Sequence, residues 1–417
     1  MTELRSGAGW RRAVPFAFTN PSVPPEAKTS SAVRILYVSH SFPLPGQPLS
    51  NVGGMQRVAT GLHDALRAHP GVELHSRVLE TSWKGTPYRM PGYLAGLLAG
   101  LAGEVERERI DVVLFSSMVT ASVATVRGAA ARRAGAILAA IPVGRDVTLP
   151  TRGYQWLVPR IFRALDVVFP ISRATAGECI ERGLPESRMH VVPCGVDTDM
   201  FAPPADRAEA RRELLATIGE TVPDDTLILC SVGRHQERKG FQWFVDAVMP
   251  RLPENVLYLV TGEGPTTPAI RAAIERRGVG DRVRLLGQVN EDTLRALYRG
   301  GDLFVMPNIH VPGDIEGFGV VMLEAGMCGM PVLAAALEGI SDVIAEGENG
   351  HLVPSQDAAA FADRIMSLRA DRAALAAASE SAARFTAATF SWAAVADRYV
   401  ELLRARVGGR GRATARP

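Results

Sequence analysis

The sequence predicts an α/β protein built from two doubly wound, Rossmann-like domains that face each other across a cleft. Three observations support this prediction. The 417 residues suffice for two domains at roughly 100–200 residues each. Short apolar runs alternate with longer amphipathic stretches along the chain, a pattern typical of parallel sheets covered by helices on both faces. The rhythm occurs twice, and a Gly- and Pro-containing stretch around residue 198 separates the two series.

Each series contains six predicted strands. In the first half we expect strands at residues 33–41, 73–80, 111–117, 136–142, 166–172 and 189–193. In the second half we expect them at residues 226–234, 255–264, 282–289, 302–308, 331–335 and 351–354. The predicted domains are therefore residues 32–198 and 199–390, with a final helix at 391–406.

Both ends of the chain are predicted to lie outside these domains. Residues 1–31 are rich in Pro, Ser and Thr without periodicity, which predicts a flexible arm rather than a signal peptide. Residues 407–417 are predicted to form a disordered basic tail. No apolar run reaches about 18 residues, so no transmembrane helix is expected.

Charge and cysteine content narrow the expected partners and location. A formal net charge of +2 gives no support for a global polyanion-binding role, so no nucleic-acid partner is expected. The cysteines form no CxxC pair and have no metal-ligand spacing. They are expected to be reduced, buried thiols of a cytoplasmic protein, at positions Cys179, Cys194, Cys230 and Cys328.

Basic residues follow the predicted strand at 226–234. Arg234 and Lys239 stand directly before a helix that is expected to begin near Gly240. A helix N-terminus carries partial positive charge, so cations there are unfavourable unless an anion lies between them. Ligands of open parallel sheets bind beyond the carboxyl ends of the strands. The pair is therefore a candidate anion site, with an ordinary exposed basic loop as the alternative.

A second group of candidates follows the predicted strand at 302–308. Glu316 and Glu324 flank a helix start, where free backbone N–H groups can bind phosphate or sugar hydroxyls. Glu324 falls inside an otherwise apolar helix, where an unpaired carboxylate is costly. A ribose diol would satisfy it, and a structural ion pair is the alternative. The residues that open this helix are Gly317, Phe318, Gly319 and Val320.

These residues together resemble the retaining glycosyltransferases of family GT4, also called glycosyl transferases group 1. The resemblance covers roughly residues 33–403, and its most specific part is the E-x7-E element of Glu316 and Glu324 with Arg234 and Lys239 upstream. It implies the GT-B fold, a nucleotide-sugar donor, and a last helix that returns to the first domain. The motifs that carry it are GGMQRV, VVPCGVDTDMF, GRHQERKGF, VTGEGP, RVRLLGQV, EGFGVVMLE, GMPVLA and GENGHLVP.

The resemblance assigns the donor to the second domain. Arg234 and Lys239 correspond to the residues that bind the donor diphosphate, and Glu324 to the glutamate that holds the ribose. Glu316 corresponds to the glutamate beside the donor sugar, and we assign it to positioning and electrostatic stabilisation rather than to nucleophilic attack. Arg234, Lys239 and Glu316 are the expected catalytic residues. Further donor contacts are expected at Gly53, Gly54, Val289, Gly317, Phe318, Gly319 and Val320.

Two positions depart from the family pattern. Many relatives carry histidine in an H-G-x-D segment where this chain has Val143, and asparagine where it has Cys194. Asp197 and Asp199 spell D-x-D, which binds metal in another glycosyltransferase fold, but here they fall in the linker motif. Because the family generally works without a divalent metal, neither a metal nor another cofactor is expected.

The first domain is expected to bind the acceptor, which is a glycan, a glycolipid or a small molecule. Arg145, Asp146 and Tyr154 are the candidate acceptor residues. The segment Gln155–Arg163 mixes aromatic and basic side chains, which fits peripheral association with an anionic membrane surface. A packed helix with snorkelling arginines is the alternative.

Three other classes of protein stay open. A sugar-nucleotide epimerase shares the fold and binds similar ligands, but it lacks the E-x7-E context. A dinucleotide oxidoreductase needs G-x-G-x-x-G after the first strand, which SHSFPLPGQPLSNVGG does not supply. A non-catalytic sugar-nucleotide-binding protein would be separated from an enzyme by donor hydrolysis or transfer.

Overall fold

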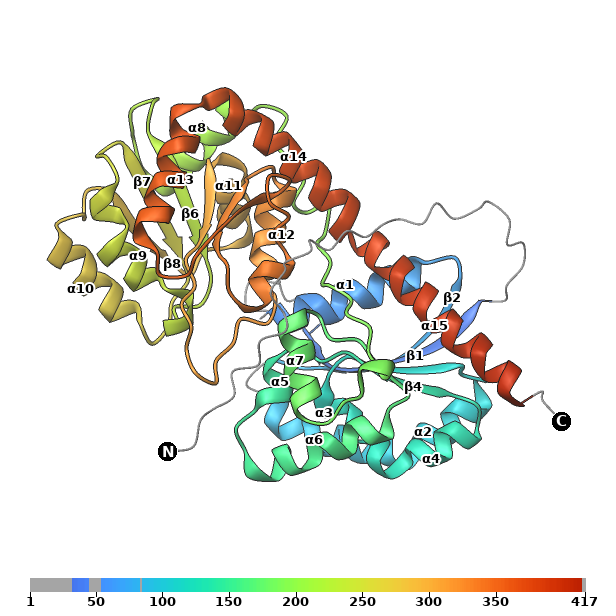
Figure 1. Cartoon of the computed structure of the whole chain (residues 1–417). Coiled ribbons are helices and arrows are strands. Elements are labelled where there is room, and N and C mark those ends of the chain that lie inside the picture. The colour runs from blue at the N-terminus through green and yellow to red at the C-terminus, as the bar shows by residue number, and fades with distance from the viewer. Residues whose placement is uncertain (1–31, 45–53, 83–84, 415–417) are drawn as a thin grey trace.

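Figure 1 shows two α/β domains joined by crossings of the chain. The computed structural model describes residues 32–44, 54–82 and 85–414. Each domain has one parallel sheet, with strand order β2-β1-β3-β4-β5 in the first and β11-β10-β9-β6-β7-β8 in the second. The predicted fold class, two doubly wound Rossmann-like domains, is confirmed.

The first domain follows the predicted order of strands and helices. Its strands are β1 (Val33–Phe42), β2 (Val72–Glu80), β3 (Val112–Phe115), β4 (Ile137–Ala140) and β5 (Val167–Val168). Its helices are α1 (Gly54–Ala68), α2 (Thr86–Arg107), α3 (Met118–Ala121), α4 (Ala124–Arg133), α5 (Arg145–Thr148), α6 (Arg152–Ala164) and α7 (Arg173–Glu181).

The predicted strand at 189–193 is wrong. This segment runs beside β5, where the His190 N–H donates to the Val168 carbonyl, but only an isolated bridge between Val168 and Met189 forms. Pro170, two residues after the end of β5, has no N–H to continue the ladder. The first sheet therefore ends at five strands rather than six.

The second domain alternates strands and helices in the same way. Its strands are β6 (Leu227–Val232), β7 (Val256–Thr261), β8 (Val283–Gly287), β9 (Leu303–Met306), β10 (Val332–Ala335) and β11 (Gly350–Val353). Its helices are α8 (Arg207–Ile218), α9 (Phe241–Ala247), α10 (Thr267–Arg277), α11 (Glu291–Gly300), α12 (Val320–Met327), α13 (Ala358–Ala370) and α14 (Arg372–Phe390).

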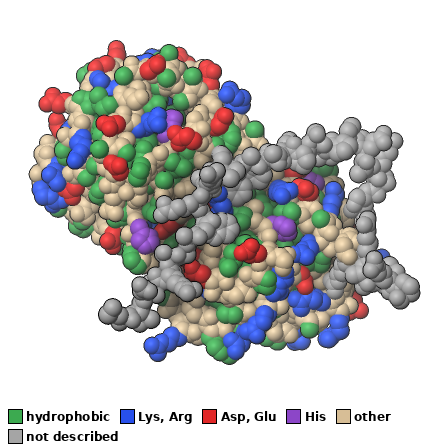
Figure 2. Space-filling model, viewed as in Figure 1, with side chains coloured by type: hydrophobic (Ala, Val, Ile, Leu, Met, Phe, Trp, Pro, Cys, Tyr) green, Lys and Arg blue, Asp and Glu red, His purple; other side chains and the backbone are tan. Residues whose placement is uncertain are grey.

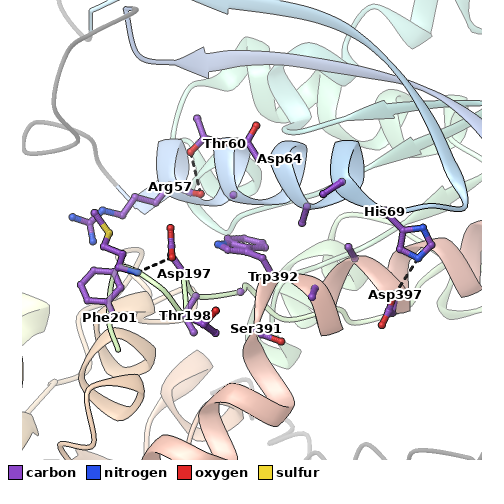
Figure 3. A pocket seen from close by; sticks show the side chains of 18 of the residues that line it. Arg57, Thr60, Asp64, His69, Asp197, Thr198, Phe201, Ser391, Trp392 and Asp397 are labelled. Carbon is purple, nitrogen blue, oxygen red and sulfur yellow. Dashed lines mark hydrogen bonds and ion pairs between the residues drawn. The ribbon is translucent and has the colours of Figure 1, made fainter. Parts of the chain in front are cut away.

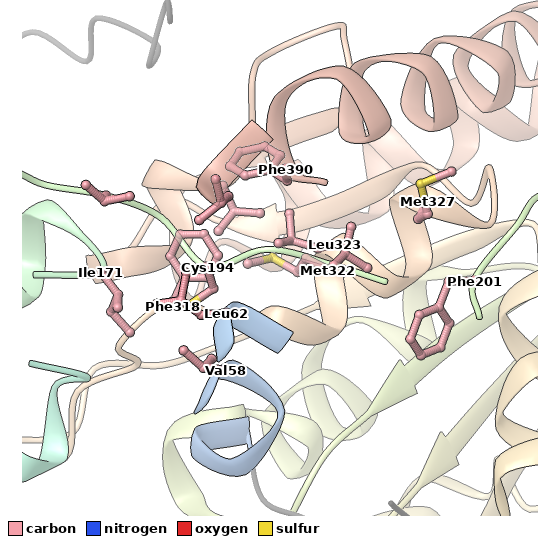
Figure 4. Close-up of a cluster of buried hydrophobic side chains, with 14 of the residues drawn as sticks. Val58, Leu62, Ile171, Cys194, Phe201, Phe318, Met322, Leu323, Met327 and Phe390 are labelled. Atoms are coloured by element: carbon pink, nitrogen blue, oxygen red, sulfur yellow. The ribbon is translucent and has the colours of Figure 1, made fainter. Parts of the chain in front are cut away.

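Apolar side chains cover both faces of each sheet, as a doubly wound fold requires. One cluster fills the outer face of the first sheet and another fills the outer face of the second. A third cluster spans both domains, and in Figure 4 Val58 and Leu62 of α1 approach Phe318 and Met322 from the second domain. The two domains therefore share a core, which fixes how their facing edges meet.

The chain crosses between the domains twice, at adjacent places. Val196 of the linker and Ser391 form an isolated parallel bridge, and α15 (Trp392–Thr414) then returns to pack against α1 of the first domain. This return matches the helix predicted at 391–406. Helix α15 continues to Thr414, beyond the end predicted at residue 406, and the disorder predicted for residues 407–417 stays a prediction.

Trp392 lies at the point where the chain re-enters the first domain. Its indole packs against Gly61 of α1 and Gly195 of the linker, and a Cβ added at either glycine would overlap the ring. Figure 3 shows the ring between α1 and the linker. Glycine is therefore required at both positions by close approach of a side chain.

Gly61→Ala and Gly195→Ala are each expected to lower the free energy of unfolding by about 2 kcal/mol, because the added methyl group overpacks the Trp392 indole. Gly103→Ala in α2 is the matched control, since nothing lies within 4 Å of its added Cβ. That change is expected to leave stability unchanged or raise it slightly. Equal melting temperatures for all three variants and the parent protein would contradict the packing argument.

Among the helices of the described residues, none combines the length and the apolar character that a membrane span requires. The predicted flexible arm at residues 1–31 lies outside the described residues.

Candidate active site

Lys239 and Glu316 form a buried ion pair at the carboxyl edge of the second sheet. Lys239 follows β6 and Glu316 follows β9, and these strands are neighbours. The Lys239 Nζ lies 2.6 Å from Oε2 of Glu316, and the two residues are 7% and 8% exposed. Two residues that the sequence assigned to catalysis are thus in direct contact.

Two further side chains lie at the same carboxylate oxygen, one through a hydrogen bond and one through an ion pair. Asn308 Nδ2 donates to Oε2 of Glu316 at 3.1 Å, and Arg238 Nε lies 3.5 Å from it. Burial raises the pKa of Glu316, but Lys239 first and Arg238 second outweigh burial, so the net pKa lies below the ordinary value. Glu316 is therefore an ionised carboxylate inside the protein.

Arg234 lies on the loop that follows β6, five residues before Lys239 in the sequence. Its side chain is exposed, and within the described ranges no ion pair or hydrogen bond engages its guanidinium. A free guanidinium on the loop that also carries Lys239 is suited to bind an anion such as a diphosphate.

The glycine-rich start of α12 faces the first domain. Gly319 has φ of +84°, a left-handed conformation that favours glycine, and from there the chain turns into Val320. A Cβ built at Gly317 would lie 3.0 Å from the Val143 carbonyl oxygen of the first domain. The Phe318 side chain packs in the shared core against Phe390, with ring centroids 6.3 Å apart. The Phe318 ring is therefore unavailable to a ligand.

The loop of the first domain that carries Val143 thus stands opposite the E-x7-E element. Gly144, the next residue, also approaches Gly317 closely. Val143 brings no polar side chain to this place. Its hydrogen bonds run from the backbone only, since the Val143 N–H donates to Oδ1 of Asp146 at 2.8 Å.

Glu324 is buried in α12 and already has partners on both oxygens. Arg57 of α1 forms an ion pair with Oε1, and the Tyr298 hydroxyl donates to Oε2 at 2.8 Å. Glu324 is 2% exposed, whereas the Arg57 side chain is 20% exposed. The structural ion pair, the alternative to ribose binding, is therefore present in this structure. It joins the two domains.

Sequence reasoning missed Arg57, although a signal existed. Arg57 stands in the first turn of α1, where a cation is unfavourable without an anionic partner. The same argument singled out Lys239. Tyr298, Asn308 and Glu338 were also missed, since none belongs to a local motif.

Glu338 follows β10 and adopts φ of +49°, a sparsely populated conformation for a residue with a side chain. Its carboxylate accepts a hydrogen bond from the backbone N–H of Glu316. His310 Nδ1 lies 3.4 Å from its other oxygen. Burial raises the pKa of Glu338. Strained conformations of this kind often occur at functional sites.

The candidate acceptor residues lie on and beside α5 and α6. Both oxygens of the buried Asp146 accept backbone N–H groups, from Met118 at 2.9 Å and from Val143. Burial raises its pKa to about 6. The Tyr154 hydroxyl donates to the Asp146 carbonyl at 2.6 Å, while Arg145 is exposed. Asp146 and Tyr154 thus hold the loop in shape, and their contact with an acceptor stays a prediction.

The remaining predicted donor residues are spread around this edge. Gly53 lies outside the described residues, and Gly54 is the first residue of α1. Val289 lies between β8 and α11 and is partly buried against the shared core. Gly54 and Val289 therefore stand at the carboxyl ends of β1 and β8, where the rule for parallel sheets places ligands.

A cavity of ≈ 500 Å³ lies between α1, the linker and α15. Arg57 and Glu324 line one part of it. Figure 3 shows Arg57 at one end and His69 and Asp397 further along. Of the predicted donor residues that the structure describes, only Val320 and Glu324 line it. Lys239, Glu316 and Arg234 do not, so this groove is separate from the diphosphate end of the candidate site.

Asp197 and Asp199 do not converge on a shared point. Asp197 Oδ1 accepts the backbone N–H groups of Asp199 and Met200, at 3.0 and 2.9 Å, so it stabilises a turn of the linker. All four cysteines are buried free thiols, as the sequence predicted. Burial raises the pKa of the Cys328 thiol to about 12.

Comparison with known proteins identifies relatives over most of the chain. Residues 52–200 match the family described as Glycosyltransferase Family 4, and residues 226–371 match Glycosyl transferases group 1. The chain is 31% identical over 412 residues to a D-inositol 3-phosphate glycosyltransferase of Xylanimonas cellulosilytica, covering 93% of this chain and 86% of that protein.

A mannosyltransferase of Mycolicibacterium smegmatis, named GDP-mannose-dependent alpha-(1-6)-phosphatidylinositol monomannoside mannosyltransferase, is 29% identical over 328 residues, covering 75% of this chain and 80% of that protein. Among solved structures, Anabaena HepE in complex with UDP superposes with a TM-score of 0.68 at 18% identity, covering 89% of this chain and 100% of that one. Sucrose-phosphate synthase of Thermosynechococcus elongatus gives 0.69 at 22% identity, covering 90% and 100%.

The solved structures share the GT-B fold with this chain. The long match to the inositol-phosphate enzyme and the two family matches show that the relationship is one of family as well as of fold. The chain belongs to glycosyltransferase family 4, the glycosyl transferases group 1, and is an enzyme of the hexosyltransferase type.

Proposed function

We propose that this glycosyltransferase moves a sugar from a UDP- or GDP-sugar to a hydroxyl acceptor with retention of anomeric configuration. The observation that carries the proposal is the Lys239–Glu316 pair at the carboxyl edge of the second sheet. A cation and an ionised carboxylate in contact, with Arg234 free on the same loop, are suited to a diphosphate beside a sugar.

The donor diphosphate is proposed to bind Arg234, Lys239 and the backbone N–H groups at the start of α12. Breaking the bond between the anomeric carbon and the phosphate oxygen leaves that electron pair on the diphosphate. Fixed cations stabilise this growing negative charge more in the transition state than in the ground state. The two cations thus supply the counter-charge, and no metal is required in the proposal.

Retention is proposed to follow from front-face displacement. The acceptor oxygen bonds to the anomeric carbon on the face that the diphosphate leaves, and its proton passes to the departing phosphate oxygen. Glu316 then needs no bond to the sugar. Lys239 and Asn308 already hold its Oε2, and Arg238 adds an ion pair, which suits a group that positions the sugar and stabilises positive charge at the anomeric carbon.

The acceptor is proposed to bind the first domain, opposite α12. The inositol phosphate and phosphatidylinositol mannoside named in the relatives' descriptions are the acceptors to test first, beside other glycans, glycolipids and small secondary metabolites.

The purified chain tests the proposal when it is incubated with UDP- and GDP-sugars, with and without these acceptors. Transfer with an unchanged anomeric configuration in the product, read by NMR coupling constants, supports it. A product of inverted configuration contradicts retention. An epimerised nucleotide sugar identifies an epimerase, and binding without turnover, detected as a thermal shift, identifies a non-catalytic protein.

Peripheral membrane association is a further part of the proposal. Helix α6 buries Val158, Ile161 and Phe162, whereas Trp156 is 62% exposed with the Arg160 guanidinium 3.3 Å from its ring centroid. Basic side chains gather along the lower edge of the first domain in Figure 2, where Figure 1 places α6. An exposed aromatic ring among arginines suits an anionic lipid surface.

Trp156→Ala with Arg163→Glu is expected to reduce co-sedimentation with vesicles that contain anionic lipid by about tenfold, since each basic residue near the surface contributes about 1 kcal/mol. Arg271→Glu on α10, another exposed arginine, is the control and should sediment like the parent protein. Equal sedimentation with neutral and anionic vesicles would count against the membrane proposal.

A further inference from the structure

Asn308 follows β9 and is 1% exposed. Its Nδ2 donates to Glu316 Oε2 at 3.1 Å, and its backbone carbonyl accepts from the Ser355 hydroxyl at 2.8 Å. Its Oδ1 is buried and has no partner among the described residues. The orientation of the amide follows from chemistry, because a carboxylate can only accept and the NH₂ group must face it.

The orphaned Oδ1 shows that this position is not optimised for stability. A buried acceptor without a donor is destabilising, and such groups are rare in folded proteins. A smaller residue would remove the orphan. What Asn308 provides in exchange is one neutral N–H donor directed at Glu316, which no neighbouring side chain of the described site supplies.

Three side chains lie close to Glu316, and all three lie at Oε2. Lys239 is at 2.6 Å, Asn308 donates a hydrogen bond of 3.1 Å, and Arg238 forms an ion pair at 3.5 Å without a hydrogen bond. Oε1 has no partner among the described residues and is not sealed from solvent. The carboxylate is therefore anchored by one oxygen and presents the other.

Lys239 has two roles in the proposed reaction, and the role of Asn308 inferred below rests on that proposed reaction. It anchors Glu316 in this structure, and it is proposed to bind the donor diphosphate. An ammonium group that turns toward phosphate weakens its hold on Oε2. Arg238 is shared with Asp314, which its Nη1 contacts at 3.0 Å. Asn308 is the one anchor of the three that has no competing partner.

We propose that Asn308 is a positioning residue that holds Glu316 by Oε2 while Lys239 binds the donor diphosphate, so that Oε1 stays directed at the transferred sugar. The side chain acts through Glu316 and touches neither the diphosphate nor the acceptor.

Asn308→Ala tests this role in the full-length enzyme. The expected result is a kcat lower by about 10- to 100-fold, since loss of alignment at a reacting group costs up to about 100-fold. The dissociation constant of the nucleoside diphosphate product should change by less than about threefold, because Arg234 and Lys239 are intact. An unchanged kcat would overturn the inference.

Asn308→Asp supplies a readout that a merely structural role would not move. A second carboxylate against Oε2 raises the pKa of Glu316, so the acidic limb of the kcat/KM profile should shift to higher pH. The control is Ser355→Ala, which removes the hydroxyl bound to the Asn308 carbonyl and leaves the amide in place. It should keep the parent's profile and kcat.

The outcomes separate this inference from the proposed function. If the parent enzyme neither transfers nor binds a nucleotide sugar, the proposed function fails. If the parent transfers, and Asn308→Asp leaves the acidic limb where it was, only the role of Asn308 fails. A shift in Ser355→Ala equal to that in Asn308→Asp would also overturn it, because general loosening of the loop would then explain both.

Discussion

Lys239→Met is expected to lower kcat/KM by about 100- to 1000-fold, the range that follows removal of one preorganised charge-stabilising donor. Methionine keeps the length of the side chain and removes the charge. The diphosphate then loses a cation, and Glu316 loses the partner that lies 2.6 Å from its Oε2. Steady-state kinetics with the nucleotide sugar that the parent enzyme uses measures both effects.

The pH dependence of kcat/KM distinguishes the loss of the diphosphate's cation from the loss of the partner of Glu316. Glu316 has a pKa below its ordinary value, with Lys239 the strongest of the groups that lower it. Activity that needs the ionised carboxylate is therefore lost only as pH falls through that low pKa. Without Lys239 the pKa rises, and the acidic limb of kcat/KM should move to higher pH. A uniform drop without any shift would mean that Lys239 serves the diphosphate alone.

Lys239→Arg sharpens the same prediction. The chain has 46 Lys and Arg residues in total, and only three of them are lysines, at positions 28, 84 and 239. Lysine at a buried position of an arginine-rich chain points to a need for a compact ammonium group. Arginine should therefore restore less than a tenth of the lost activity. The exposed Arg271→Met is the control, and full rescue by arginine would contradict the geometric argument.

The sequence predicted this half of the site because its signals are local. The order of strands and helices places Lys239 after β6 and Glu316 after β9, and neighbouring parallel strands bring their carboxyl ends together. The glycine at position 319 predicted the start of α12, and the structure gives Gly319 a φ of +84°, which favours glycine. Each of these predictions depended only on a predicted strand, the turn that follows it and the residue after that turn.

The partners of these residues could not be predicted in the same way. Tyr298 and Asn308 are separated from the carboxylates they bind by 26 and 8 positions, and Arg57 is separated from Glu324 by 267 positions. Such contacts depend on how two domains and several helices pack, which no spacing rule contains. The prediction of a strand at 189–193 was wrong for a related reason. Pro170, in the neighbouring segment, lacks the N–H that would continue the ladder.

Arg57→Met is expected to lower the free energy of unfolding by about 3 kcal/mol, the lower end of the range for breaking a buried ion pair by removing one partner. Glu324 is 2% exposed, and only the Tyr298 hydroxyl would remain to satisfy its charge. Urea unfolding measures the change. Because the pair joins the domains, small-angle scattering should also show a larger radius of gyration.

The double variant Arg57→Met with Glu324→Gln isolates the pair. If the cost comes from a stranded charge, neutralising Glu324 should restore most of the stability, and the two single changes should add up to more than the double one. Additive effects would mean that Arg57 acts through packing, for which its position 6.0 Å from the Phe201 ring centroid provides a route.

The same substitution tells whether Arg57 hinders or helps the donor. Glu324 is proposed to hold the ribose, yet Arg57 occupies its Oε1 here, so the donor must displace a cation before the diol can bind. The apparent affinity for the donor is reduced in proportion to the fraction of protein in which Glu324 is free of Arg57. Arg57→Met should therefore bind UDP or GDP roughly threefold or more tightly, measured by calorimetry. Weaker binding would mean that Arg57 turns to the donor once it has released Glu324, and the ion pair would then be a step toward binding rather than a barrier to it.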